Sequence, residues 1–472
     1  MQLLATKKDY IWSYLGTFFR MGSSFLLLPF LLLFLGDKEL GLWYVFLAIA
    51  SFVTLFQAGF VPSFSRNIVY CWSGVQSLSK EGLCKTPDNR GDVSPTLFCN
   101  LIEASRRIYR LIALVAFVLL AIFGTQYIIS VASEMDYSEY LAAWSVFCCG
   151  VFFNLYFSYY ESLLRGVGNF PGTNKAMIAS SFVQVALDAV LLAFGLGIMA
   201  CSIGYFIQGL IFRLLCRHYF YSMKSVSELV NDGGRDVNSR EIKDIISIVS
   251  HNAIRDTVVS FSNYAVTTAN TLICSLVTSL TTTGTYSILL QLTSAVASLA
   301  TVVLTTNQPA LQSAFACGDS ELEKKITSST VFAFVLIYCL GIALVAIVVI
   351  PLMQLIRPSF SCDWILFVIM TVYIFLWRQH SMCATFLTNT NKLPYVRAFV
   401  ISAFIGVLLT LLMAVFTDLG LYSLVLGQGL SQIVYNNWKW PHVAAGRFGC
   451  SYFSLLKCGM VQALSGIRSR LN

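Results

Sequence analysis

The sequence predicts an all-α polytopic membrane protein with about twelve transmembrane helices. Only 11% of its 472 residues are charged and 57% are hydrophobic, whereas a soluble globular chain carries roughly 25% charged residues. Apolar runs of about 20 residues, the length that crosses a bilayer, recur along the whole chain. This composition leaves too little polar surface for a water-soluble fold.

The predicted spans follow one another with short polar turns or with long polar loops between them. Glycine and charged residues such as Gly36 and Asp37 mark the short turns. The long loops are residues 66–107 and 222–244. The spans are residues 11–35, 41–65, 108–131, 141–164, 176–198, 201–221, 246–276, 285–311, 328–356, 364–388, 395–417 and 419–438.

The distribution of lysine and arginine predicts the topology, because cytoplasmic loops are enriched in these residues. With a cytoplasmic N-terminus, 25 of the 31 Lys and Arg fall in cytoplasmic segments. The external loops hold only Lys38 and Arg357, and the other four lie within spans. We therefore expect both termini to be cytoplasmic.

The second long loop divides the predicted spans into six plus six. Arg20 and Arg255 each follow a Lys-Asp pair at the same interval, and each opens its half. Because both halves begin in the cytoplasm, they are predicted to be parallel repeats about an axis along the membrane normal. The predicted parts are an N-terminal six-helix lobe, a cytoplasmic linker, a C-terminal six-helix lobe and a cytoplasmic or interfacial tail, over residues 1–230, 231–244, 245–440 and 441–472.

Two spans carry long polar stripes at helical spacing. Hydrogen-bonded contacts between helices would explain short stripes, but a water-filled cavity explains stripes that cross nearly the whole bilayer better. In the seventh span the stripe comprises Asn252, Asp256, Ser260, Asn263, Thr267 and Asn270. In the eighth it comprises Gln291, Ser294, Ser298, Thr301, Thr305, Gln308 and Gln312.

Charged residues within the predicted spans mark a transport path. A charge at mid-helix costs at least about 2.5–3.5 kcal/mol, so such residues usually face a cavity or a partner. The candidates are Arg20, Arg255, Arg378, Glu161, Asp188 and Asp256.

Other interpretations of these charges stay open. Arg20 and Arg255 are close enough to the cytoplasmic side to snorkel or to form structural ion pairs, and Asp256 would balance its neighbour Arg255. Glu161 and Arg165, four residues apart, are spaced as a private ion pair. Arg213 lies one turn from Arg217, and we expect it to snorkel.

The sequence contains no indication of a metal, a cofactor or a nucleic-acid partner. The 14 cysteines show no metal-ligand spacing, and most fall inside apolar runs, where cysteine behaves as a small hydrophobe. The net charge of +8 comes from the loops. No arrangement of a catalytic triad is visible.

The opening of the chain resembles the bacterial polysaccharide transporters, the Wzx-type O-antigen flippases of the multidrug/oligosaccharidyl-lipid/polysaccharide exporter superfamily. The resemblance lies in residues 10–17, Pro29 and residues 36–43, and extends to the length and the six-plus-six layout. It implies two six-helix lobes, alternating access, and a substrate of undecaprenyl-pyrophosphate carrying an oligosaccharide repeat unit. It also implies the bacterial inner membrane, membrane lipids, a polysaccharide polymerase and chain-length proteins as partners, and a coupling ion, H⁺ or Na⁺.

In such flippases cationic cavity residues hold the pyrophosphate, and Arg20, Arg255 and Arg378 match that role here. Acidic and amide groups would suit the sugar hydroxyls. The remaining predicted substrate-binding residues are Glu161, Asp188, Asp256, Asn263, Asn270, Gln291 and Gln308.

Two alternatives to the flippase are kept. A cation-coupled multidrug or small-molecule exporter of the same superfamily would want a net acidic cavity, and the balance of three basic and three acidic residues leaves this alternative open. A membrane polysaccharide polymerase or glycosyltransferase would need a large external loop for its catalytic residues. The predicted external loops are too short for this, so we expect a transporter and not an enzyme.

Overall fold

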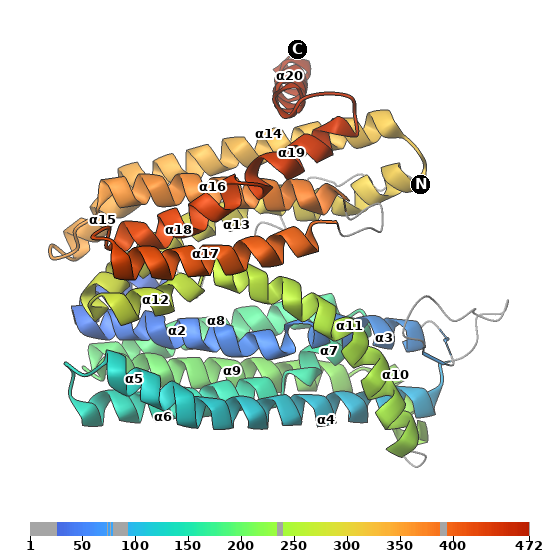
Figure 1. The fold of residues 1–472 in the computed structure, drawn as a ribbon. Helices are drawn as coiled ribbons and strands as arrows, with labels where there is room; N and C mark the ends of the chain where they lie inside the picture. Colours follow the sequence, from blue (N-terminus) through green and yellow to red (C-terminus); the bar gives the residue numbers. More distant parts are fainter. Residues whose placement is uncertain are drawn as a thin grey trace. The chain divides into compact units, whose positions relative to one another are not determined.

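The computed structural model describes residues 26–72, 74–75, 77–78, 93–233, 239–387 and 394–471, and regular structure in these residues is entirely helical (Figure 1). Contacts between residues divide the chain into two compact units. We call Ser23–Leu276 the N-terminal unit and the described residues from Val277 onward the C-terminal unit.

The N-terminal unit begins with helical residues 26–34 and is built from long helices interrupted by short breaks. Its further helices are α2 Asp37–Ala58, α3 Phe60–Trp72, α4 Pro95–Leu119, the π-helical turn η1 Leu120–Gly124, α5 Thr125–Val131, α6 Tyr137–Tyr156, α7 Tyr159–Gly166, α8 Phe170–Ala193, α9 Gly197–Tyr221, α10 Lys224–Gly233, α11 Ser239–Val266 and α12 Ala269–Val277.

The C-terminal unit has the same construction. Its helices are α13 Leu280–Ala316, α14 Ser320–Leu344, the π-helical turn η2 Val345–Val349, α15 Ile350–Ile356, α16 Trp364–Leu387, α17 Val396–Phe416, α18 Leu421–Ile433, α19 Asn436–Gly446 and α20 Tyr452–Leu471.

Nine helical stretches of the described residues are long and apolar enough to cross a membrane. Each coincides with a predicted span: the second to sixth and the eighth to eleventh. The first predicted span lies mostly outside the described residues. The seventh and twelfth are helical but do not qualify, so the total of twelve stays a prediction.

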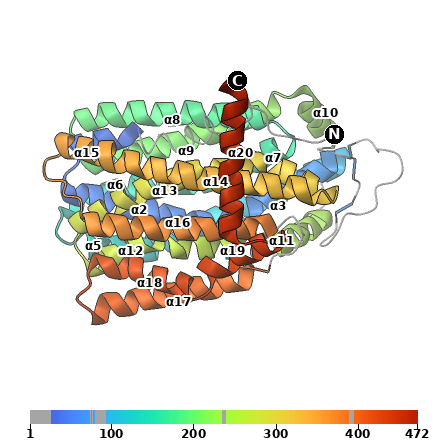
Figure 2. The same cartoon turned by 90° about the horizontal axis from the view of Figure 1, so that it is seen from above.

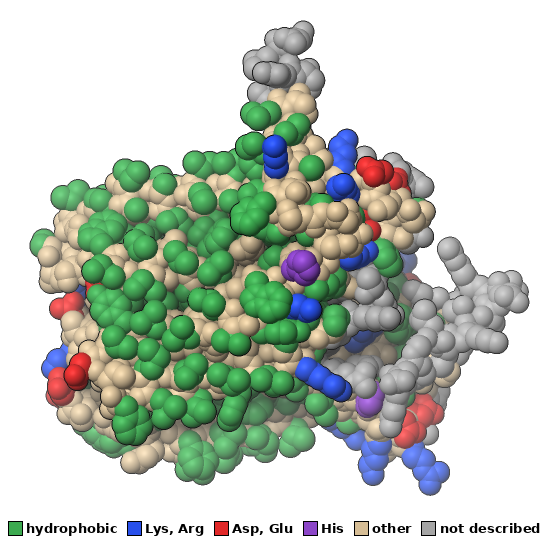
Figure 3. Space-filling view, turned by 45° about the horizontal axis from the view of Figure 1, so that its top comes forward, with side chains coloured by type: hydrophobic (Ala, Val, Ile, Leu, Met, Phe, Trp, Pro, Cys, Tyr) green, Lys and Arg blue, Asp and Glu red, His purple; other side chains and the backbone are tan. Residues whose placement is uncertain are grey.

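Large apolar side chains cover the outer faces of these helices, with most charged side chains gathered at the helix ends (Figure 3). Phe182 on α8, Ile347 in η2 and Phe404 on α17 are 74%, 74% and 72% exposed. Monomeric soluble proteins rarely expose contiguous apolar patches of this kind. The prediction of a multi-pass membrane protein is therefore confirmed.

Several helices extend beyond the predicted spans into the polar loops. α4 begins at Pro95, because Ser94 caps it by accepting a hydrogen bond from the Leu97 N–H at 3.3 Å and proline suits the first turn. α10 lies wholly within the predicted loop 222–244. The fifth span ends earlier than predicted, because Gly195 and Gly197 take positive φ angles of 79° and 52° and turn the chain.

The seventh predicted span is not one continuous helix. α11 ends at Val266, and α12 begins at Ala269 after a turn at Thr267. Its polar residues therefore do not share one unbroken helical face, as the spacing predicted, because a break changes the direction of the side chains that follow it.

α11 packs against α2, α3 and α4 of the N-terminal unit. The Tyr264 hydroxyl donates to the Ala48 carbonyl at 3.1 Å, and Asn100 donates to Glu241 at 2.7 Å. A Cβ at Gly59, between α2 and α3, would overlap the Ala253 carbonyl, so glycine permits this close crossing. The boundary between the two compact units thus falls at Leu276, one span after the predicted linker at 231–244. The two six-helix lobes stay a prediction.

The C-terminal tail forms α20, which crosses α14 at a steep angle (Figure 2). Gly459 lies directly on the backbone of α14 at Ser328, and Ser329 donates to Gln462 at 2.5 Å. Phe453 and Leu464 remain 79% and 54% exposed on the opposite face. One face of α20 thus packs on α14 while the other exposes apolar side chains, and the interfacial placement of the tail stays a prediction.

Candidate functional site

Glu161 lies at the centre of a charged cluster in the N-terminal unit. The short helix α7 places Glu161 and Arg165 on one face, and their side chains pair at 2.7 Å. Arg213, on α9, pairs with the other carboxylate oxygen of Glu161 and donates through Nε to Asn154 of α6 at 2.9 Å. The cluster therefore joins three helices. The predicted Glu161–Arg165 pair is present, but it is not private, because Arg213 shares the carboxylate.

The prediction that Arg213 snorkels is wrong. Its side chain is directed into the unit and is 6% exposed. The paired carboxylate of Glu161 compensates the buried guanidinium, which removes the need to reach water. The same pairing engages the Glu161 carboxylate with two arginines, so any role in binding sugar hydroxyls would compete with them.

Asp188 on α8 is a fully buried carboxylate that forms no ion pair with the residues the structure describes. Gln184, one turn earlier on the same helix, is placed to donate a hydrogen bond to it. Ser181 and Gln184 precede it on the same face of α8 and are 8% exposed each. The carboxylate lies against Gly204 of α9, where a Cβ would overlap Oδ1. This face of α8 is thus polar and directed into the unit. The Asp188 carboxylate is its charged group, and a proton or a cation would neutralise it.

Arg378 on α16 is the corresponding uncompensated cation of the C-terminal unit. Its guanidinium lies over the indole ring of Trp377, with Cζ at 4.3 Å from the ring centroid. The Nε atom is buried and has no hydrogen-bond partner. Among the described residues, no carboxylate pairs with Arg378.

The polar stripe of the eighth span lies along the single unbroken helix α13. Gln291 and Gln308 are half-buried, as are most members of the stripe, while Leu292 and Asn307 beside them are buried. The hydroxyls of Ser298, Thr301 and Thr305 donate to carbonyls of their own helix, at 2.8, 2.6 and 2.9 Å. These hydroxyls therefore do not join α13 to another helix, which favours an accessible polar face.

The seventh-span candidates are only partly visible. Asn263, near the end of α11, is exposed, whereas Asn270 on α12 is 1% exposed. The side chains of Arg255 and Asp256 lie outside the described residues, and so does Arg20. Their predicted roles stay predictions.

The predicted site residues thus fall into two groups. Glu161 and Asp188 belong to the N-terminal unit, while Gln291, Gln308 and Arg378 lie on α13 and α16, which pack together in the C-terminal unit. Within the part of the chain that the structure describes, no cluster of metal-ligating side chains occurs.

Sequence reasoning missed two groups that shape the site. Arg213 was available as a charged residue within a span, but its partner is 52 residues away and is revealed only by the packing of α7 against α9. The position of Gly204 against Asp188 has no sequence signal, because many glycines occur in membrane helices without such a contact.

The chain matches no protein-family model and no curated protein sequence. Among solved structures it is similar to an inward-facing multidrug resistance MATE family transporter of the MOP superfamily. The identity is 15%, the TM-score is 0.61, and 97% of each chain is covered. This likeness extends over nearly the full length of both proteins.

Two further transporters show the same similarity. The MATE multidrug transporter DinF-BH has 12% identity and a TM-score of 0.61, with 91% of this chain and 93% of that chain covered. The Vibrio cholerae MATE transporter VcmN has 14% identity and a TM-score of 0.57, with 95% and 97% covered.

The chain has a MATE-like transporter fold. At these identities the likeness establishes the fold alone. The MATE-like fold agrees with the predicted superfamily, and the neighbours that share it are transporters rather than enzymes.

Proposed function

We propose that this protein is a flippase that moves undecaprenyl-pyrophosphate-linked oligosaccharide repeat units, of an O-antigen or a similar surface polysaccharide, to the periplasmic leaflet. Its MATE-like fold supports a membrane exporter. Transporters of this fold have been solved in inward-facing and outward-facing conformations. Alternating access of two units would carry the saccharide across while the lipid tail stays in the bilayer.

The observation that supports an anionic substrate is the positive charge of Arg378, which no carboxylate of the described residues pairs with. A half-buried guanidinium without a carboxylate is costly unless another group supplies a negative charge. Arginine binds phosphate oxygens in pairs through its planar fork, which suits a pyrophosphate. The positive charge of this group would repel a cationic compound and attract a pyrophosphate. Arg20 and Arg255 are proposed to complete the clamp.

Asp188 supports coupling to a cation. A carboxylate that is fully buried and unpaired in an interior polar face would take up H⁺ or Na⁺ to remove its charge. Release of that ion on the other side would bias the exchange between the two conformations. The protein would then lie in the bacterial inner membrane, supplied by the enzymes that assemble the repeat unit and followed by a polymerase and chain-length proteins.

The accessible polar face of α13 gives the saccharide a path. Its amides, such as those of Gln291 and Gln308, and its hydroxyls offer hydrogen bonds to sugar hydroxyls without fixing one geometry. The Glu161 cluster is proposed to hold α6, α7 and α9 together rather than to bind sugar directly, because its carboxylate is already engaged.

The test is complementation of a deletion strain of the host bacterium. Arg378→Gln should lower surface polysaccharide export about 10- to 150-fold, since hydrogen bonds to charged groups contribute about 1.5–3 kcal/mol. Arg378→Lys should restore part of it. Lipid-linked repeat units should accumulate on the cytoplasmic side, and Arg397→Gln, at an exposed arginine on α17, serves as the charge-matched control.

Immunoblots must show equal amounts of each variant in the membrane. Normal export by Arg378→Gln would show that Arg378 does not bind the substrate. Unchanged surface polysaccharide in the deletion strain would show that the protein is not the flippase.

A cation-coupled multidrug exporter is the second candidate, because the structural neighbours are multidrug transporters. It predicts that the deletion strain retains cationic dyes and that Arg378→Gln leaves dye export intact. Dye efflux and polysaccharide export measured in the same strains decide between the two.

A further inference from the structure

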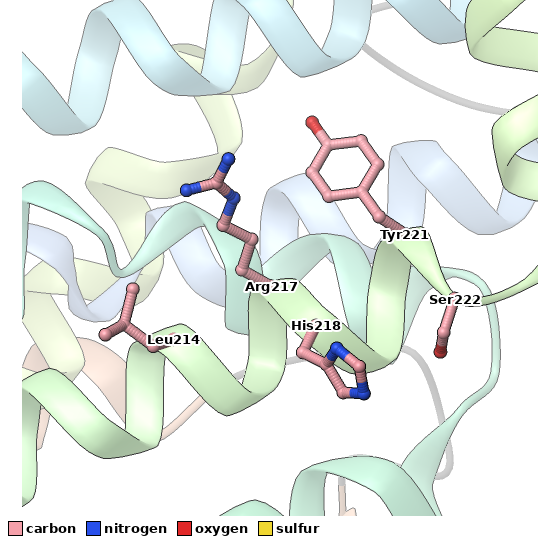
Figure 4. Close-up of a pocket in the computed structure, with 5 residues that line it drawn as sticks. All are labelled: Leu214, Arg217, His218, Tyr221 and Ser222. Carbon is pink, nitrogen blue, oxygen red and sulfur yellow. The ribbon is translucent and has the colours of Figure 1, made fainter.

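The cytoplasmic end of α9, as the predicted topology places it, carries a basic cavity that the proposed transport function does not use. The cavity has a volume of about 620 Å³ and is lined by Leu214, Arg217, His218, Tyr221 and Ser222. Their spacing of 3, 1, 3 and 1 residues puts them on one face of the helix. Arg217 and Tyr221 project to one side of the helix, and His218 and Ser222 project to the other (Figure 4). Two rows of polar side chains therefore line the cavity.

The lining has the chemistry of an anion site. Arg217 and His218 are both exposed, and no carboxylate is among the lining residues that the structure describes. Arg217 has no ion-pair partner in the described chain and lies 6.0 Å from the ring centroid of Tyr160, which supports the guanidinium without neutralising it. Arg106 of α4 is close to the Tyr221 hydroxyl, but its charge is paired with Glu103 at 3.0 Å, so Arg217 and His218 are the groups that can meet an anion.

The cavity lies where the apolar outer surface gives way to basic side chains. Leu214, one turn further into the span, is 42% exposed. On the neighbouring helix α8, which packs against α9, Ile178 and Phe182 are 40% and 74% exposed. Acyl chains would cover these apolar residues, and a headgroup phosphate would then be at the level of Arg217 and His218. Basic pockets at the cytoplasmic ends of membrane helices suit phosphate headgroups in this way.

We propose that this cavity binds the phosphate headgroup of an anionic membrane phospholipid, with Arg217 and His218 as its principal donors. The site is separate from Arg378 and is independent of the transported substrate. Neutral histidine keeps one N–H donor, so binding does not require its protonation. Bound lipid would fix the end of α9 next to α10, which follows after Ser222 and Met223.

The test uses the purified full-length protein in nanodiscs of phosphatidylcholine with or without phosphatidylglycerol. We expect phosphatidylglycerol to be retained in native mass spectra and to raise the thermal midpoint. The double variant Arg217→Gln/His218→Gln should retain it at least about tenfold less, because each lost charge-assisted contact weakens binding by that order. Lys224→Gln, which removes an exposed charge from the adjacent α10, should behave as the wild type.

Arg217→Lys is the control for misfolding, because it changes the side chain but keeps the positive charge, and it should therefore retain the lipid. Equal retention of both lipids by the wild type, or equal retention of phosphatidylglycerol by the double variant, would overturn the proposal. An excess of inorganic phosphate that displaces the lipid, or that stabilises the protein equally in phosphatidylcholine, would overturn the lipid as the ligand and assign a soluble phosphate instead. These outcomes do not depend on polysaccharide export, so they are distinguishable from failure of the flippase function.

Discussion

At the residue scale, the two uncompensated charges, Asp188 and Arg378, differ in what would neutralise them. Asp188 is fully buried against Gly204 and has room for little more than a proton or a small ion. Arg378 is partly accessible and stacks on Trp377, which leaves the edge of its guanidinium for a larger anion. Asp188 belongs to the N-terminal unit and Arg378 to the C-terminal unit, and the proposed function assigns the coupling ion to the first and the substrate to the second.

Replacing Asp188 by Asn should abolish dependence of export on the ion gradient while the protein stays folded. The amide has the same shape but takes up no proton, and removal of an uncompensated buried charge relieves a penalty of several kcal/mol. We expect a thermal midpoint in detergent no lower than that of the wild type. Asp418→Asn, at an exposed carboxylate, is the control. Gradient-driven export by Asp188→Asn at the wild-type rate would contradict the coupling role.

The charged clusters show which residue contacts a sequence can predict. The Glu161–Arg165 pair follows from its spacing of four residues on a helix, and the structure has it. Arg213 was assigned to the membrane surface because it lies one turn from Arg217. Its burial depends on Glu161 and Asn154, contributed by other helices, and no local pattern reports contacts of that range.

At the element scale, the stripe on α13 distinguishes a helix that faces water from one that faces lipid or another helix. Its hydroxyls are hydrogen-bonded within the helix, and its members are partly accessible along its length. An aqueous path would explain the partial accessibility, because polar side chains in the membrane usually face a cavity and not lipid.

Cysteines at Ser298 and Thr301 should react with a water-soluble thiol reagent, in a variant whose native cysteines are replaced. A cysteine at Leu340 on α14, which is 61% exposed on an apolar surface, should not react because thiolates do not form in lipid. Reaction rates followed by mass spectrometry give the comparison. Protection of Ser298 and Thr301 to the level of Leu340 would show that this face of α13 is dry.

Hydrophobic runs predicted which segments are helical but not where each helix ends. Membrane-spanning length is set by apolar residues, whereas helix ends are set by caps and by glycine turns, such as Ser94 and Gly195. The seventh span was the least predictable, since its polar residues permit a break at Thr267 that an apolar helix in lipid would not tolerate. Its packing with the N-terminal unit depends on the close crossing at Gly59.

At the scale of the whole molecule, composition alone predicted the fold class, because a membrane protein must cover its surface with apolar side chains. The resemblance of residues 10–17 and 36–43 pointed to the superfamily, whereas the MATE-like fold itself is shown by the structure, because its neighbours share only 12–15% sequence identity. The substrate is less predictable still, because one transporter fold hosts many substrates and only particular side chains select among them.

The orientation of the whole chain in the membrane is the broadest prediction. Insertion places loops rich in Lys and Arg in the cytoplasm, and the predicted cytoplasmic segments hold 25 of the 31. In intact cells, a membrane-impermeant thiol reagent should therefore label a cysteine at Glu134, between α5 and α6, and leave one at Glu228 on α10 unlabelled until the cells are opened. Both native side chains are exposed, at 71% and 63%, so access to the side chain does not confound the comparison.

The reverse labelling pattern would invert every assignment that depends on orientation. α10, the basic cavity on α9 and the C-terminal α20 would then face the periplasm, and the two halves would lose their cytoplasmic start. The lipid-linked substrate would also meet the transporter from the wrong side. Labelling at Glu134 alone would instead identify the α5–α6 loop as lying on the periplasmic side, to which the proposed substrate is released. The Arg217 cavity would then lie among the headgroups of the inner leaflet, where anionic lipids are available.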